Sequence, residues 1–182
     1  MIIWLTWRIA AGKGVIVQIL EEKWFTYHTI SQIIRDEAKK KSISIKRKNL
    51  QDLWNKYREE YWNNIWIKKL IEKIDWWWNH IIDWIRNVWE IKELRKLNNF
   101  YLISVDADQE TRFKRVLSRW KDSDPKDWNW FLSIDDRDFY ENDPSWQQVG
   151  KCMKLADFSI ENNWDLDSLK EKVESYFEKI IK

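Results

Sequence analysis

Short apolar runs alternate along the whole chain with longer segments in which apolar residues recur every three or four positions. The apolar runs predict strands over residues 1–6, 25–30, 80–83, 100–105 and 157–161. The run at 100–105 has the apolar character of a strand that helices cover on both faces.

Helical periodicity fills the segments between these runs. Ser31, Asp108 and Asp165 precede three of these segments and are residue types that favour the N-cap position. The predicted helices cover residues 15–23, 32–41, 46–61, 64–74, 90–97, 109–119, 131–140 and 166–180.

Strands that alternate with helices predict an α/β fold, here a three-layer sandwich with a mostly parallel sheet of about five strands. A length of 182 residues predicts one domain, spanning 1–182. In such folds ligands bind beyond the carboxyl ends of the strands. The loop after residue 6 and the strand end at Asp83 are therefore the places where we expect a site.

Composition narrows the classes of function. The net charge of +2, from 32 basic and 30 acidic residues, gives no electrostatic argument for a nucleic-acid partner. A single cysteine excludes an internal disulfide and favours a reducing compartment. No apolar stretch approaches the ~20 residues that span a bilayer, so we expect no membrane association and a cytoplasmic location.

Tryptophan and glycine counts are both abnormal. The chain has 16 Trp and 3 Gly, whereas glycine makes up about 7% of an average protein. Many of the indoles stand in turn-like contexts such as IDWWWN at 74–79, DWNW at 127–130 and SWQQ at 145–148, where φ > 0 is common and glycine is the usual residue. We predict that many of the Trp positions are glycine positions.

The loop TWRIAAGKG at 6–14 carries the first motif. A phosphate-binding loop of the Walker A type reads G-x-x-x-x-G-K-[ST] between a strand and a helix. Gly12 and Lys13 fit this pattern, while Trp7 stands at the first glycine position and Gly14 at the hydroxyl position. If Trp7 is replaced by glycine in this comparison, the loop becomes GRIAAGKG and departs only at its last letter.

The stretch IIDWIRNVWEI at 81–91 carries the second motif. With glycine at Trp84 and Trp89 it becomes IIDGIRNVGEI, which resembles the Asp-Gly-x-Arg signature of nucleoside monophosphate kinases such as adenylate kinase. Its spacing is one residue shorter than in adenylate kinase. Reading Trp as glycine thus restores both motifs. We attribute these Trp letters to UGA codons, which some bacterial lineages read as glycine and which are written here as Trp. UGG codons at 7 and 84 would contradict this hypothesis.

With these replacements the chain resembles the P-loop nucleotide kinases of the adenylate kinase and dephospho-CoA kinase superfamily. It is most similar to an AAA-like, kinase-like group related to the kinase-like portion of deoxycytidylate deaminases. The resemblance is carried, beyond the two motifs, by SQIIRDEA, NLQDLWNKYREEYW, ETRFKRVLSRWK, RDFYE and ADFSIEN.

The resemblance implies a site for ATP and Mg²⁺. Lys13 would reach the β- and γ-phosphates, and Mg²⁺ would have no direct protein ligand but a water-mediated contact with Asp83. The residues implied to form the loop around the phosphates are Trp7, Arg8, Ile9, Ala10, Ala11, Gly12, Lys13, Gly14 and Val15.

The resemblance also implies a set of arginines. Arg35 and Arg86 would hold the acceptor phosphate, since a guanidinium binds phosphate through two parallel hydrogen bonds. Arg119, with Arg115 as a second candidate, and Arg137 would supply charge from a short lid at about 120–131.

The implied reaction is transfer of the γ-phosphoryl group of ATP to a small nucleotide, most simply a nucleoside or deoxynucleoside monophosphate. Gln32 stands where related kinases with a hydroxyl acceptor have a carboxylate base, which favours a phosphate acceptor. Three alternatives stay open: a dephospho-CoA kinase-like enzyme, a non-catalytic nucleotide-binding regulator, and, if every Trp is genuine, an aromatic-rich binding protein. The oligomeric state is left open.

Overall fold

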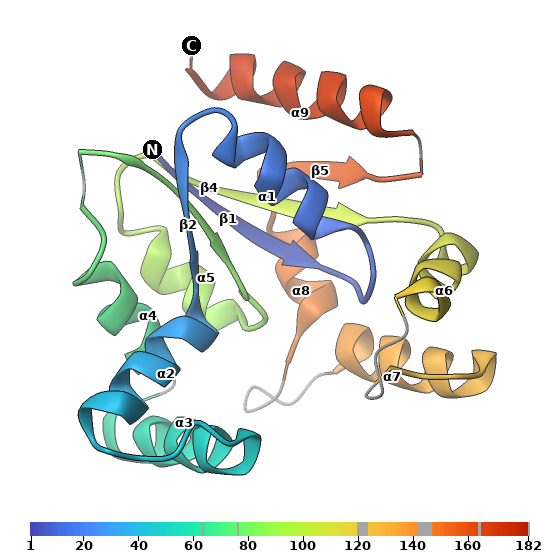
Figure 1. Cartoon of the computed structure of the whole chain (residues 1–182). Coiled ribbons are helices and arrows are strands. Elements are labelled where there is room, and N and C mark those ends of the chain that lie inside the picture. Colours follow the sequence, from blue (N-terminus) through green and yellow to red (C-terminus); the bar gives the residue numbers. More distant parts are fainter. Residues whose placement is uncertain (63, 76, 120–123, 142–146, 164, 182) are drawn as a thin grey trace.

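Five parallel strands form the centre of the molecule, in the order β2-β3-β1-β4-β5 (Figure 1). This arrangement confirms the predicted fold class. The computed structural model describes residues 1–62, 64–75, 77–119, 124–141, 147–163 and 165–181. The strands are β1 (Ile2–Trp7), β2 (Phe25–Thr29), β3 (Asn79–Asp83), β4 (Phe100–Asp106) and β5 (Phe158–Glu161).

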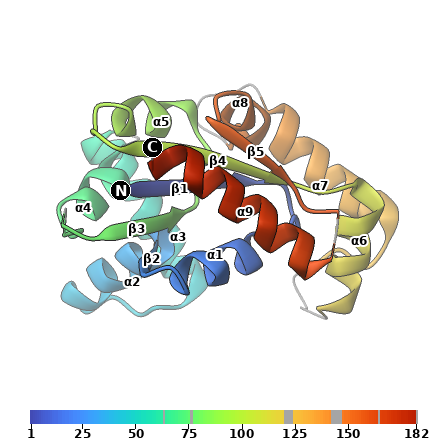
Figure 2. The same cartoon turned by 90° about the horizontal axis from the view of Figure 1, so that it is seen from above.

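Helices cover both faces of the sheet (Figures 1 and 2). Helices α1 and α9 pack on one face and α4, α5 and α8 on the other, while α6 and α7 lie beyond the carboxyl ends of β1 and β4 (Figure 1). The helices are α1 (Lys13–Glu21), α2 (Ile30–Lys40), α3 (Arg47–Tyr61), α4 (Ile65–Ile71), α5 (Val88–Leu94), α6 (Gln109–Ser118), α7 (Trp128–Tyr140), α8 (Val149–Lys154) and α9 (Leu166–Ile181).

Helix starts differ from the prediction where a side chain nearby offers a better cap. Thr29, and not Ser31, caps α2 by accepting a hydrogen bond from the Gln32 N–H at 3.0 Å. Asn87 begins α5 earlier than predicted, because its side chain and Glu90 satisfy each other's backbone N–H groups in a capping box.

The region between α6 and α7 also differs from the prediction. Asp127 accepts the Trp130 N–H and caps α7, so residues 128–131 of the predicted lid form the first turn of a helix. Residues 120–123 of that lid lie outside the described residues, as do Trp76, Trp146 and Trp164. Helix α8 has only six residues, too few for a helical period to stand out in the sequence.

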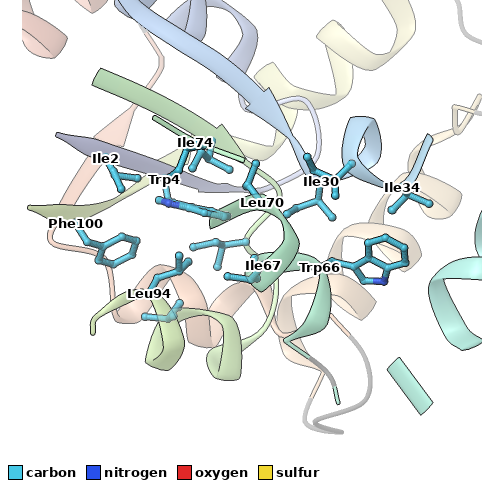
Figure 3. Packing of buried hydrophobic residues seen from close by; sticks show 14 of the residues in the cluster. Ile2, Trp4, Ile30, Ile34, Trp66, Ile67, Leu70, Ile74, Leu94 and Phe100 are labelled. Carbon is cyan, nitrogen blue, oxygen red and sulfur yellow. The ribbon is translucent and has the colours of Figure 1, made fainter. Parts of the chain in front are cut away.

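Trp4 lies in the middle of the apolar core beneath the sheet (Figure 3). Its side chain is fully buried, and Figure 3 shows the indole among Ile67, Leu70 and Phe100. Within the described part of the chain, the Nε1–H group of Trp4 has no hydrogen-bond partner. A buried donor without a partner costs about 1–3 kcal/mol. Trp4 therefore fits the core by shape but not by polarity.

Three of the tryptophans that the structure describes have a positive φ. Trp24, Trp62 and Trp84 have φ of 67°, 80° and 90°. Trp62, the C-cap of α3, combines its φ with a ψ of 160°, a region that is essentially restricted to glycine. A bulky aromatic residue at such positions is strained, and this finding agrees with the glycine hypothesis at these three positions.

The Trp62→Gly substitution is expected to stabilise the protein by about 1 kcal/mol, because it removes backbone strain and an indole that is 80% exposed. The matched control is Trp89→Gly on α5, where an indole 50% exposed sits in a helix without a positive φ. That change is expected to destabilise by about 1 kcal/mol. Urea unfolding of both variants measures the two signs, and destabilisation by both would contradict the strain argument.

Candidate functional site

The loop between β1 and α1 turns on Gly12. This residue is the N-cap of α1 and has φ of 91°. A Cβ atom there would lie 2.1 Å from Nδ2 of Asn162, so a side chain is excluded by contact as well as by conformation. Asn162 Nδ2 in turn donates to the Ala11 carbonyl at 2.9 Å. Asn162, the residue that follows β5, thereby restrains the backbone of the loop at Ala11.

Helix α6 holds the outer side of the loop. Arg112 Nη1 donates to the Ile9 carbonyl at 3.3 Å, and Arg115 Nη1 donates to the Ala11 carbonyl at 3.4 Å. These contacts engage carbonyl oxygens of the loop. The first turn of α1 carries no acidic residue, which leaves its N-terminus suitable for an anion.

Lys13, Asp83 and Tyr27 meet beside this helix N-terminus. Lys13 Nζ lies 2.7 Å from Asp83 Oδ2 and 3.4 Å from the Tyr27 hydroxyl. The Tyr27 hydroxyl also donates a short hydrogen bond to Asp83 Oδ2. Burial and the neighbouring Asp83 raise the pKa of Tyr27 above its ordinary value, so the phenol stays protonated. Nothing in the sequence around Tyr27 singled it out, because its partners lie on other elements.

Asp83 has one oxygen to spare. Its side chain is 4% exposed, and within the described ranges Oδ1 is buried without a hydrogen-bond partner. The described residues include no group of three or more His, Cys, Asp or Glu that could hold a metal directly. A lone carboxylate oxygen next to the phosphate-binding loop fits a Mg²⁺ ion that is held mainly by phosphates and waters.

A cavity of about 180 Å³ opens between the loop and α7. Residues 7–10 form one wall, Arg86 and Arg119 line it, and Asp138 and Phe139 close it from α7. The structure thus brings Arg86 and Arg119, both predicted, to this cavity, while the predicted Arg115 contacts the loop at the Ala11 carbonyl. Arg119 also forms a salt bridge with Asp124.

Two indoles hold Arg86 inside this cavity. The Arg86 guanidinium carbon lies 5.1 Å from the Trp7 ring centre and 4.4 Å from that of Trp84, and the two rings meet edge to face at 6.4 Å. Lys13 Nζ lies 5.0 Å from the Trp7 ring centre. Arg86 Nη1 donates to the Gln147 side chain, whereas in the described part of the molecule Arg86 Nε has no partner. Burial lowers the pKa of Arg86, against the opposing charges of Asp138 and Asp83.

Asp135 on α7 ties the cavity wall together. Both its oxygens accept from Arg112, at 2.6 and 2.8 Å, and it also forms a salt bridge with Arg8 of the loop. Burial works to raise the pKa of Asp135, but hydrogen bonds from Arg112 and Arg8 outweigh it and hold the pKa below its ordinary value. The Arg8 guanidinium also lies over the Phe139 ring at 4.3 Å.

Two predicted arginines lie elsewhere. Arg35 is exposed on α2 and does not line the cavity. Arg137 is largely exposed and bonds its neighbour Asp138. Asp135, Asp138 and Tyr27 are the residues of the site that sequence reasoning missed. The sequence pattern nearest to Asp135 and Asp138 was RDFYE at 137–141, and it led to the prediction of Arg137 instead.

Glu90 is a buried acid directly behind Arg86. Its Oε2 accepts the backbone N–H groups of Arg86 and Asn87 at 3.0 and 3.1 Å. Burial nevertheless raises the pKa of Glu90 to about 7, with the two backbone hydrogen bonds opposing the shift. This carboxyl positions the backbone that presents Arg86 to the cavity.

A protein-family model matches most of this chain. It is the model of the AAA domain family AAA_18, and the match covers residues 3–140. The chain belongs to this AAA domain family. A UPF0200 protein of Sulfurisphaera tokodaii is 28% identical over 99% of this chain and 97% of its own length, and a UPF0200 protein of Pyrococcus horikoshii is 27% identical over 100% and 98%.

Solved structures show the fold of this AAA domain. Shikimate kinase from Aquifex aeolicus has a TM-score of 0.59 at 11% identity, covering 98% of this chain and 97% of its own. Gluconokinase from Sinorhizobium meliloti has a TM-score of 0.59 at 9% identity, covering 98% and 91%. Dephospho-CoA kinase from Campylobacter jejuni has a TM-score of 0.51 at 16% identity, covering 98% and 96%. The chain has a P-loop kinase fold, as predicted. No helix among its described residues is both long and apolar enough to cross a bilayer.

The pKa of Glu90 makes stability depend on pH. The unfolded chain ionises this acid near pH 4.5 and the folded one near 7, so the native state loses stability as pH rises between these values. Glu90→Gln keeps an acceptor oxygen and removes the charge. The variant is expected to gain about 1–3 kcal/mol relative to the unaltered protein as pH rises from 5 to 8.

Denaturant unfolding across that pH range measures the difference. Glu93→Gln on the same helix is the control of opposite sign, because a hydrogen bond from Lys96 lowers the pKa of Glu93. Its removal is expected to cost a little stability at neutral pH. A constant difference between Glu90→Gln and the unaltered protein from pH 5 to 8 would contradict the assignment.

Proposed function

We propose that this protein is an ATP-dependent kinase that transfers the γ-phosphoryl group to a nucleoside or deoxynucleoside monophosphate. The observation that carries the proposal is the cavity in which Arg8, Arg86 and Arg119 line the space beside the phosphate-binding loop and Lys13. Phosphoryl transfer depends mainly on positioning and on neutralising charge, and the guanidiniums of this cavity support such a role. ATP as donor and the P-loop kinase fold are consistent with the cytoplasmic location that we propose.

Each group has a role in this proposal. Residues 7–15 bind the phosphates of ATP, with Lys13 between the β- and γ-phosphates. Mg²⁺ bound with ATP neutralises phosphate charge, and Asp83 meets its water shell through Oδ1. Arg86 binds the acceptor phosphate, and Arg119 stabilises the charge of the transferred group. Arg35 and Arg137 stay in the proposal as groups that a bound acceptor would recruit.

A second acceptor class is favoured by one residue. Asp138 lies 3.8 Å from Arg86 Nη1 and lines the cavity, where a carboxylate could take the proton of an acceptor hydroxyl. Such chemistry would suit a dephospho-CoA kinase-like or other small-molecule kinase. We rank it second because three guanidiniums, those of Arg8, Arg86 and Arg119, line the cavity together with only two carboxylates, Asp135 and Asp138, and this excess of positive charge favours an anionic acceptor.

The indoles of Trp7 and Trp84 conflict with this function. Trp7 stands beside Lys13, and both rings flank Arg86, so they fill space that the phosphates would need. Trp84 also carries the strained φ of 90°. We therefore propose glycine as the natural residue at both positions, encoded by UGA. By contrast, Trp66 is buried with its Nε1–H donating to the Trp54 carbonyl at 3.3 Å, and no such conflict marks it.

The Trp7→Gly/Trp84→Gly variant is expected to bind ATP at least about tenfold more tightly than the chain as its sequence stands, because two indoles leave the phosphate site. Calorimetry with a non-hydrolysable ATP analogue measures the affinity. ADP release with a panel of monophosphates, shikimate, gluconate and dephospho-CoA then identifies the acceptor.

Trp24→Gly is the matched control, since Trp24 also has a positive φ but lies away from the site. It precedes β2, whereas Thr29, which pairs with Asp83, is at the other end of that strand. The control variant is expected to leave ATP affinity unchanged. Weak ATP binding by the Trp7→Gly/Trp84→Gly variant, or turnover that survives Lys13→Ala in that variant, would overturn the kinase. UGG codons at 7 and 84 in the gene would overturn the recoding.

Arg86→Lys in the Trp7→Gly/Trp84→Gly variant is expected to raise the KM for the acceptor about 10–100-fold, because an ammonium cannot make two parallel hydrogen bonds to a phosphate. The Kd for ATP is expected to change little. Arg95→Lys, an exposed arginine that bonds Asp157 and the Leu155 carbonyl, is the control. Equal effects on ATP and acceptor would place Arg86 at the donor instead.

A further inference from the structure

Lys13 has a protein partner where the proposed function requires a nucleotide. Its ammonium lies 2.7 Å from Asp83 Oδ2, and that carboxylate is almost fully buried. To give all three N–H donors of its ammonium to the β- and γ-phosphates, Lys13 must leave this salt bridge. A buried carboxylate that loses a charged partner is costly, and the cost would weaken ATP binding.

Tyr27 lies at the same oxygen. Its hydroxyl donates to Asp83 Oδ2, so this oxygen keeps a donor when Lys13 departs. Tyr27 is on β2 and Asp83 on the adjacent β3, where Tyr27 pairs with Ile81 and Thr29 with Asp83. The two side chains therefore project from the same face of neighbouring strands, two residue positions apart. Backbone pairing on both strands fixes this relation without help from the loop.

We propose that Tyr27 is a positioning residue that allows Lys13 to move from Asp83 to the phosphates of the bound nucleotide. Its hydroxyl satisfies Asp83 Oδ2 in both positions of the lysine. It also keeps the carboxylate oriented so that Oδ1, buried and unpartnered among the described residues, stays available to the water shell of Mg²⁺. This role rests on the proposed function.

A tyrosine suits this task because its hydroxyl keeps its proton and therefore keeps donating to Asp83 Oδ2. Burial and Asp83 raise the pKa of the phenol above its ordinary value, with Glu21 contributing in the same direction. The hydroxyl therefore stays protonated at neutral pH. A histidine or lysine at the same position could lose its proton or compete for the phosphates.

The test is a double-mutant cycle in the Trp7→Gly/Trp84→Gly variant, with Tyr27→Phe, Lys13→Met and both together. Calorimetry with a non-hydrolysable ATP analogue and Mg²⁺ measures each Kd. Tyr27→Phe is expected to raise the Kd about tenfold when Lys13 is present, and less than about twofold when Lys13 is replaced by methionine. A residue that supports only the fold would give the same factor in both backgrounds.

Tyr176→Phe is the matched control. Tyr176 lies on α9, and the change removes a hydroxyl that donates to the Ser159 carbonyl of β5 at 2.9 Å. Its Kd is expected to equal that of the parent. A Tyr27→Phe effect that does not depend on Lys13, or an unchanged Kd in a parent that binds ATP, overturns the role of Tyr27 alone. A parent that fails to bind the analogue overturns the proposed function and this role with it.

Discussion

The buried carboxylate of Asp135 is the contact on which the shape of the site depends. It joins α7, on which it lies, to Arg112 of α6 and to Arg8 of the loop between β1 and α1. Asp135 and Arg112 have side chains 2% and 1% exposed, so losing either one would leave the other buried with only its second partner, Arg8 for Asp135 and Asp106 for Arg112. Because Arg112 also donates to the Ile9 carbonyl, the same ion pair that places α7 holds the backbone of the loop.

Segments from distant parts of the chain thus restrain this loop near the N-terminus. Asn162, after β5, reaches the Ala11 carbonyl and limits residue 12 to glycine, while α6 and α7 restrain the other side. Such multiple restraint is what a phosphate site requires, since the position of backbone N–H groups decides how well an anion is bound. Lys13 of this loop contacts Asp83 and Tyr27, which lie on the two neighbouring strands β3 and β2.

Tryptophan at several positions disagrees with this otherwise consistent architecture. Trp62 and Trp84 have backbone conformations that favour glycine, Trp4 buries an unpartnered donor among the described residues, and the Trp7 ring centre lies 5.0 Å from Lys13 Nζ. The conflicts have three physical causes: backbone strain at Trp62 and Trp84, an unpaired polar group at Trp4, and occupied space at Trp7. One substitution type, glycine for tryptophan, removes all of them, and this is why we attribute them to one origin in the codons.

The strands and most helices could be predicted because the period of apolar residues is a local property. The helix of residues 149–154 could not be predicted because six residues are too few to show a helical period. The start of α7 was predicted too late because residues 128–130 are in a polar, turn-like segment, although Asp127 caps a helix there. At the site, Lys13 and Arg86 could be found from motifs. Tyr27, Asp135 and Asp138 could not, because each acts through a partner 23 to 127 positions away along the chain.

The sequence by itself determined the alternation of elements, the phosphate-binding loop and the family resemblance, since these depend on spacing along the chain. Only the tertiary structure decided which arginines line one cavity, which carboxylates neutralise them and which tryptophans have a left-handed backbone. Those features depend on how distant segments meet. A carboxylate such as Asp135 acquires its role from the two guanidiniums that folding brings to it, and no local pattern records that meeting.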